Sequence, residues 1–162
     1  MTIQAYTATE LAEKLSAQYH FGDKTDIFRV LRHYTNLGLL PTIGEVHTGT
    51  GKKRLYPQDS LIRAGILMRC NRAGLAVTLI KKLISKLEAA LEAEGCSTLI
   101  DACNKFKQPC FVFTLPFGVG RGEGRGGVEG LAEEKAAQKL LGDAIVIHLA
   151  PYKIHELPKL LK

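Results

Sequence analysis

The sequence lacks the long apolar run that a membrane-spanning helix needs. Its opening residues, MTIQAYTATE, also lack the basic segment followed by an apolar one that is typical of a secretory signal. The four cysteines form no C-x-x-C pair, the spacing found in many zinc sites and redox motifs. We therefore expect a cytoplasmic protein that has no membrane contact and whose cysteines are free thiols.

Motifs of catalysis are missing as well. The sequence contains no G-x-S-x-G, no H-E-x-x-H and no pair of carboxylates placed for acid-base chemistry. Gly122, Gly124 and Gly127 have G-x-G-x-x-G spacing, but the tract 118–130 holds seven glycines in thirteen residues, so composition alone explains the match. Ala150 stands where a dinucleotide site would have an acid. We expect neither an enzyme nor a nucleotide cofactor, and we interpret the tract as an exposed loop.

A metal site is not indicated by the cysteines. Cys96, Cys103 and Cys110 are evenly spaced by seven residues, and soft metal ions prefer sulfur ligands. The neighbours of Cys103 and Cys110 are apolar, however, as they are around inert buried thiols. We expect no bound metal, with a thiolate metal site as the alternative.

Acidic residues are scarce in the first half of the chain only. Residues 1–83 hold twelve Lys and Arg against six Asp and Glu, whereas residues 84–162 hold ten against ten, so the net charge of +6 arises entirely in the first half. A basic half favours a polyanionic partner, through phosphate contacts and the release of counterions. The alternative is a modest surplus that only aids solubility.

The first half reads as short helices around a hairpin. Thr7 and Glu10 predict a capping box at a helix start, with Tyr6 and Leu11 as a hydrophobic staple. Residues 22–41 predict a second helix, capped by Thr25 or Asp26 and ended by Gly38. Between Leu40 and Tyr56 we expect a β-hairpin whose tip is HTGTGKK. Helices are then expected at 57–74, with Pro57 in the first turn, at 75–95 and around 97–106.

The last third changes in texture. CFVFTLPF at 110–117 predicts a buried strand, 131–142 a helix, 143–150 a second strand and 152–161 a terminal helical turn. A strand, a helix and a strand in this order predict a parallel pair with a right-handed connection. The whole chain is thus expected to be α+β, with parts at 1–75, 76–107 and 108–162.

The hairpin and the second helix carry the cations that matter for function. Small residues at the tip allow a close approach to a surface, and Lys52, Lys53 and Arg54 follow them. Phosphate oxygens accept hydrogen bonds from Lys, Arg and Tyr, and such contacts fix a protein on duplex DNA. Arg29 and Arg32 lie on the helix, which can enter the major groove, where Arg makes two hydrogen bonds to guanine. Helix and hairpin together make a winged helix-turn-helix.

These same residues resemble the MerR family of bacterial transcription regulators. The resemblance is carried by ELAEKL, LRHYTNLGLLP, GKKRLYPQDSL and RCNRAGLAVTLIKKL, in the family's order, over residues 7–83. It implies an N-terminal winged helix-turn-helix, dimerisation through an antiparallel coiled coil after the helix that begins at Ala76, and an effector of unknown kind. Arg32 and Tyr34 match the family's phosphate-contacting pair, and Arg54 and Tyr56 match the Arg-x-Tyr of the wing.

We therefore expect a homodimeric, DNA-binding transcription regulator. The residues expected to contact DNA are Lys24, Thr25, Arg29, Arg32, His33, Tyr34, Lys52, Lys53, Arg54 and Tyr56. Two features depart from the family pattern. The segment between Ala12 and Arg32 is longer than the usual tight turn allows, so the first helix, the turn or the second helix must be extended, and Thr35 stands where an acid is common. The alternatives are an excisionase-like or architectural DNA-binding protein, and an adaptor whose basic face meets an acidic protein.

Overall fold

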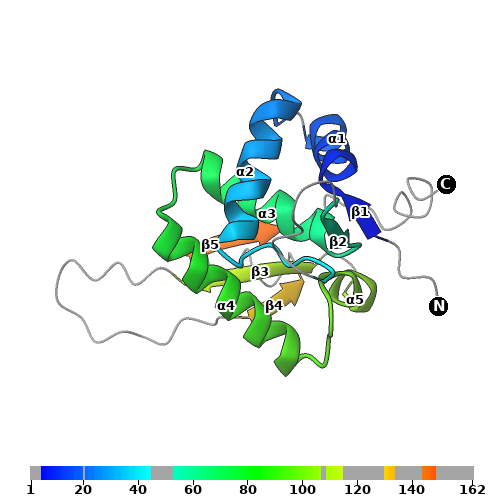
Figure 1. Ribbon diagram of the computed structural model, residues 1–162. Helices are drawn as coiled ribbons and strands as arrows, with labels where there is room; N and C mark the ends of the chain where they lie inside the picture. The colour runs from blue at the N-terminus through cyan, green and yellow to red at the C-terminus, as the bar shows by residue number, and fades with distance from the viewer. Residues whose placement is uncertain are drawn as a thin grey trace. The chain divides into compact units, whose positions relative to one another are not determined.

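The computed structural model describes residues 5–19, 21–44, 53–106, 109–114, 130–133 and 144–148. Within these ranges the protein is α+β and mostly helical, with five helices, a two-stranded sheet and a three-stranded sheet (Figure 1). The chain divides into two compact units, Met1–Ile80 and Lys81–Lys162. The α+β class expected from the sequence is therefore confirmed.

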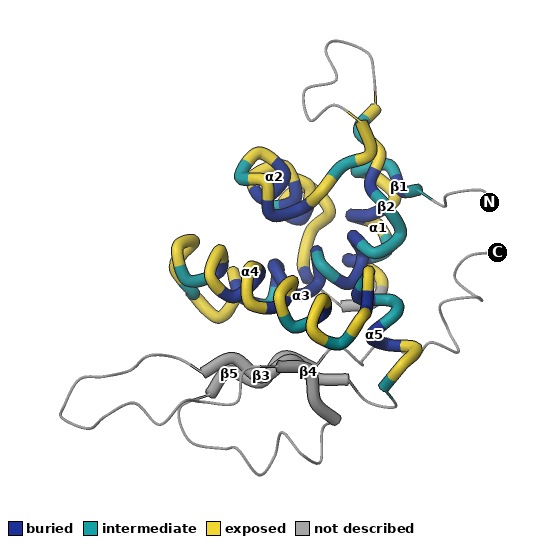
Figure 2. Tube along the Cα trace, turned by 90° about the horizontal axis from the view of Figure 1, so that it is seen from below, coloured by how far each residue is buried: buried dark blue, intermediate teal, exposed yellow. Residues whose placement is uncertain are grey.

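The first unit is built from three helices and a small sheet. α1 (Ala8–Tyr19) contacts both α2 (Lys24–Asn36) and α3 (Ser60–Arg72). α1 and α2 each have a buried and an exposed face, whereas most of α3 is buried (Figure 2). The core of this unit includes Leu11 and Leu15 of α1, Ile27 and Leu31 of α2, and Leu61 and Leu67 of α3. The elements of the unit are β1 (Ala5–Thr7), α1 (Ala8–Tyr19), α2 (Lys24–Asn36), β2 (Leu55–Pro57) and α3 (Ser60–Arg72).

The start of α1 has the capping box expected from the sequence. The backbone N–H of Thr7 donates to the Glu10 carboxylate at 2.7 Å, and the backbone N–H of Glu10 donates to the Thr7 hydroxyl oxygen at 3.3 Å. Tyr6 and Leu11 are both buried, as a hydrophobic staple requires. The direction in which the chain enters α1 is therefore fixed by polar and apolar contacts together.

α2 begins at Lys24, slightly earlier than the sequence predicted. Its N-cap is Asp23, whose carboxylate accepts from the backbone N–H of Thr25 at 3.0 Å, so the expected caps Thr25 and Asp26 were wrong. The Asp23 side chain lies just before the helix, where it can accept from the free backbone N–H of Thr25. Thr25 itself already lies inside the helix, so it is not the N-cap. Gly38 ends the helix with a φ of +73°, as predicted.

Most of the extra residues between Ala12 and Arg32 belong to the two helices themselves. α1 has 12 residues and α2 has 13, and α1 ends at Tyr19 while α2 begins at Lys24. The connection is thus short. Its Phe21 is buried, with the Arg72 guanidinium of α3 at 5.1 Å from the ring centroid.

The hairpin expected between Leu40 and Tyr56 is present only in part. The backbone N–H of Ile43 donates to the carbonyl of Leu55 at 2.8 Å, which makes one antiparallel bridge. The main partner of β2 is instead β1, which the sequence analysis did not predict, with Tyr6 opposite Tyr56. Residues 45–52, which include most of the tip, lie outside the described residues. Pro57 closes β2 rather than opening the next helix, and α3 begins at Ser60, so that expectation was wrong.

The two helices after α3 lie close to where the sequence predicts them. α4 spans Val77–Ala93 and α5 spans Leu99–Lys105, with Gly74 and Gly95 in the left-handed conformation at the ends of α3 and α4. Thr98 and Asp101 form a second capping box at the start of α5. The apolar stripe of α4 is buried, and it consists of Ile80, Leu83, Ile84, Leu87 and Leu91.

The strands of the last third are antiparallel, which corrects the expected parallel pair. β3 (Pro109–Thr114) lies between β4 (Gly130–Glu133) and β5 (Ala144–His148), and both neighbours run antiparallel to it. Residues 130–133 are thus a strand and not the beginning of a helix. Leu131, Ala132 and Glu133 favour a helix by their type, but here they pair with β3 as a strand. An antiparallel neighbour needs no helical crossover between the two strands. The rest of the expected helix, the glycine tract up to residue 129 and the terminal turn lie outside the described residues.

None of the helices in the described ranges combines the length and the apolar character needed to cross a membrane.

A buried hydrogen bond between Tyr56 and Thr35 should contribute to the stability of the first unit. The Thr35 hydroxyl donates to the carbonyl of Leu31 at 2.8 Å, so the Tyr56 hydroxyl, 3.1 Å away, donates to Thr35. We predict that Tyr56→Phe lowers the free energy of unfolding by about 1 kcal/mol, the usual net contribution of such a bond. Urea denaturation of Tyr56→Phe, Thr35→Val and the double variant measures the coupling. Losses that simply add in the double variant would show that the bond contributes nothing.

The capping box of α1 should make stability depend on pH. Hydrogen bonds from the Thr7 backbone and hydroxyl hold the pKa of Glu10 below its ordinary value of 4.5. A lowered pKa in the folded state gives stability that is complete above pH 4.5 and is lost as the pH falls through the folded-state pKa. We predict that Glu10→Gln, which keeps an acceptor but cannot titrate, loses less stability than the wild type between about pH 6 and about pH 3. Urea midpoints test this, with Glu92→Gln on the exposed side of α4 expected to behave like the wild type.

Candidate functional site

A groove of about 330 Å³ lies in the first unit. It is formed where the start of α1, the exposed side of α2 and the segment that returns from the hairpin come together. Its lining residues are Thr7, Ala8, Thr9, Phe28, Arg32, Lys53, Arg54 and Tyr56. Four of the residues singled out from the sequence thus share one surface, although they come from two separate parts of the chain.

Three cations dominate the charge of this groove. Arg32 of α2 and Lys53 are exposed, and Arg54 is half-buried. Among the described residues none of these three forms an ion pair. Within the described residues, no ion pair therefore neutralises these three charges.

The positive end of α1 also borders the groove. Ala8 and Thr9 lie in the first turn, where backbone N–H groups have no partner within a helix and carry partial positive charge. The Glu10 carboxylate is the opposing charge, since it is already held by Thr7 and its pKa is lowered further by the charge of Lys53. The Glu10 carboxylate thus already accepts hydrogen bonds in the capping box, whereas three cations line the groove.

The two tyrosines expected at the interface are core residues. Tyr34 and Tyr56 are each 1% exposed. The Tyr34 hydroxyl donates to the side-chain oxygen of Asn71 at 3.4 Å, and burial raises the Tyr34 pKa, with a smaller contribution from Cys70. Tyr56 lines the inner wall of the groove, but its hydroxyl is turned to Thr35. Their first role is therefore to pack α2 against α3 and the returning segment.

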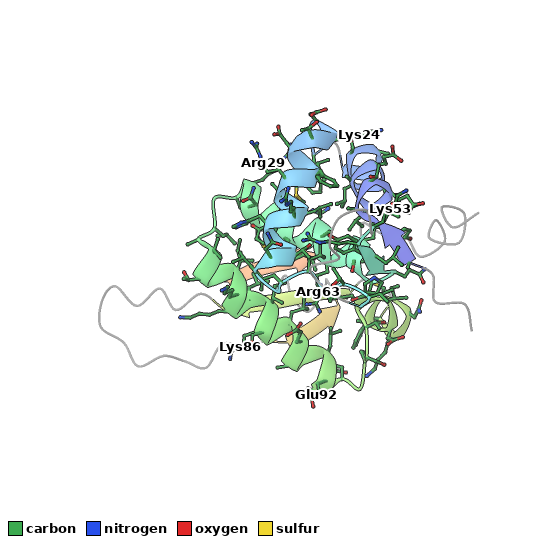
Figure 3. All side chains as sticks on the ribbon, in the orientation of Figure 1. Lys24, Arg29, Lys53, Arg63, Lys86 and Glu92 are labelled. Atoms are coloured by element: carbon green, nitrogen blue, oxygen red, sulfur yellow. The ribbon has the colours of Figure 1, made fainter. Side chains whose placement is uncertain are left out.

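The remaining expected residues of α2 lie outside the groove. Lys24 is paired with Glu13 at 3.2 Å and Arg29 with Asp26 at 2.6 Å, all with exposed side chains. Figure 3 shows Lys24 and Arg29 projecting from α2, and Lys53 beside the start of α1. Ion pairs so exposed are weak, so either cation can exchange its partner.

Three further expected residues need separate mention. The backbone N–H of Thr25 is taken up by Asp23, although its side chain is exposed. His33 is exposed, with its ring 5.4 Å from that of Tyr34. Lys52 lies outside the described residues.

Sequence reasoning missed several members of the groove. Thr7 and Ala8 were seen only as a helix start, because their position beside Arg54 depends on the pairing of β1 with β2. Phe28 was passed over, although it breaks the expected pattern. It follows the buried Ile27 and is 42% exposed, on a face of α2 that is otherwise polar. An aromatic residue out of phase with the apolar stripe was the signal that could have found it.

The cysteines do not form a metal centre in the described part of the chain, where no group of three His, Cys, Asp or Glu residues is placed to hold an ion. Cys70, Cys96 and Cys103 are buried free thiols, as expected. Burial raises the pKa of Cys70 to about 11, so its unreactive thiol form prevails at neutral pH. Cys110 lies in β3, but its side chain is outside the described residues.

Comparisons with protein-family models, with curated proteins and with solved structures found no match to this chain.

Proposed function

We propose that this protein binds double-stranded DNA through the groove of its first unit, as a transcription regulator of the MerR type. The observation that carries the proposal is the meeting of Arg32 with Lys53 and Arg54 in one groove, where none of them forms an ion pair with another described residue. In this proposal α1 and α2 form a helix-turn-helix and the segment from Leu40 to Pro57 forms its wing.

The groove suits a phosphate backbone rather than a single charged side chain. Arg32 and Arg54 can each offer two parallel N–H donors to phosphate oxygens, and Lys53 adds a point charge. The first-turn amides of α1, at Ala8 and Thr9, are further donors for an anion. A run of neighbouring phosphates satisfies such donors on several elements at once, which a lone carboxylate does not.

α2 is the element that we propose for the major groove. Thr25, Arg29 and Arg32 are exposed and follow one another at three- and four-residue spacing along its outer face. The Arg29 guanidinium is held by an exposed Asp26, so exchange of this partner for a phosphate or a guanine costs little. Phosphate contacts by the wing would set the register in which this face meets the bases.

The homodimer and the cytoplasmic location remain proposals. The apolar stripe of α4 is buried, and the exposed side of this helix carries polar residues such as Lys82 and Glu92. A second copy of the chain would therefore have to use another surface, or this stripe would have to be uncovered first. An excisionase-like protein would use the same groove without any effector, so a response of DNA binding to a small ligand or to thiol oxidation separates the two.

Binding of duplex DNA tests the proposal. Fluorescence anisotropy should be measured on a mixed-sequence duplex pool and on fragments from upstream of the coding region, across a range of salt concentrations. We predict that Arg54→Ala binds every duplex about tenfold more weakly, since a charge-assisted hydrogen bond contributes about 1.5 kcal/mol. Its plot of log affinity against log salt should be shallower by about one phosphate contact. Arg32→Ala should weaken binding as well, and should change sequence preference if Arg32 also contacts a base.

Lys82→Ala is the matched control, because it removes one exposed cation of α4 that is not part of the groove. It should bind like the wild type. Equal losses for Lys82→Ala and Arg54→Ala would mean that only overall charge matters and would contradict the groove. An absence of binding to any duplex at physiological salt would instead point to an acidic protein as the partner.

A further inference from the structure

One residue of the groove has no part in gripping phosphates. Phe28 is 42% exposed, the largest exposed fraction among the large apolar side chains of the described residues. It lines the groove together with the cations Arg32, Lys53 and Arg54. The exposed part of this ring is unfavourable in water, so covering it with an apolar group of a ligand would be favourable.

The position of Phe28 relative to Arg32 is fixed by the helix. The two residues are four apart in α2, so they lie on the same face, one turn from each other, and both line the groove. Whatever duplex segment Arg32 contacts must therefore pass beside the ring of Phe28.

Duplex DNA offers one apolar group at this depth. In the major groove, thymine carries a methyl group on C5, and apolar side chains recognise it by contact. C5 is on the edge of the pyrimidine nearest its own strand, so this methyl lies close to the sugar-phosphate backbone. A ring held next to phosphate-binding cations is thus at the right place to cover it.

We propose that Phe28 is a specificity-determining residue that contacts the 5-methyl group of a thymine beside the phosphates bound by Arg32 and Arg54. The inference rests on the proposed function, duplex DNA binding by this groove. It adds a preference that cations cannot supply, since phosphate contacts are the same for every sequence.

Removal of the methyl group alone is the sharpest test. A random-sequence duplex library is first enriched on the wild-type protein, and an enriched duplex is then synthesised with each thymine replaced in turn by uracil. Base pairing and phosphates are unchanged by this replacement. We predict that one replacement weakens binding by the wild type about fourfold, the value of one buried methyl or methylene group. Phe28→Ala should bind the thymine and uracil duplexes equally, and Phe28→Leu should keep part of the difference.

Val77→Ala is the control, since Val77 is also exposed but does not line the groove. It should discriminate thymine from uracil as the wild type does. If the wild type binds duplex DNA but no uracil replacement matters, the role of Phe28 is overturned while the proposed function stands. Tighter binding of a single strand than of its duplex, lost in Phe28→Ala, would also overturn it and would indicate stacking on unpaired bases. Failure to bind any duplex would overturn both.

Discussion

The hydrogen bond between Tyr56 and Thr35 holds the two halves of the candidate interface together. Tyr56 belongs to the segment that returns from the hairpin, and Thr35 lies in the last turn of α2. Both side chains are buried, so neither can exchange its partner for water without opening the core. Arg54 is two residues from this anchor and Arg32 is three residues from it on the other side, so this buried contact helps to set the distance between the cations.

This arrangement separates the roles of stability and binding within one short segment. Along residues 53–56, Lys53 is exposed and Arg54 is half-buried, whereas Tyr56 is buried in the core. The end of α2 likewise combines a cation at the surface with a tyrosine in the core, because Arg32 is exposed and Tyr34 is buried. The resemblance to MerR regulators groups each arginine with its tyrosine. In this chain each tyrosine packs in the core and so fixes the position of the backbone that carries its arginine.

Local features were predictable from the sequence, and long-range pairing was not. The capping boxes of α1 and α5 depend on residues three apart, and the helix ends at Gly38, Gly74 and Gly95 depend on the residue itself. The pairing of Tyr6 with Tyr56 depends on a strand of three residues far from its partner, and no local pattern marks so short a strand. The same limit explains the antiparallel sheet, because the helix formers Leu131, Ala132 and Glu133 lie in a strand that pairs with the distant β3.

The candidate site was predictable to the same extent. Arg32, Lys53 and Arg54 were found from charge and spacing, and none of the three forms an ion pair with another described residue. Arg29 was not distinguished from them, although Asp26 three residues earlier could have indicated its ion pair. The place of Thr7 and Thr9 in the groove became visible only in three dimensions, whereas Phe28 could have been noticed as an aromatic residue out of phase with the apolar stripe of α2.

The pairing of the first strand with the second also has a consequence for the order of folding. Residues 5–7 leave the ribosome well before residues 55–57, so β1 must wait without a partner while α1 and α2 are already able to form. The groove is complete only when the whole stretch from β1 to β2 has been synthesised. Proteolytic trimming before α1 would therefore remove the partner strand of β2 together with the capping box of α1, and would leave the hydrogen bond between Tyr56 and Thr35 to hold the returning segment against α2.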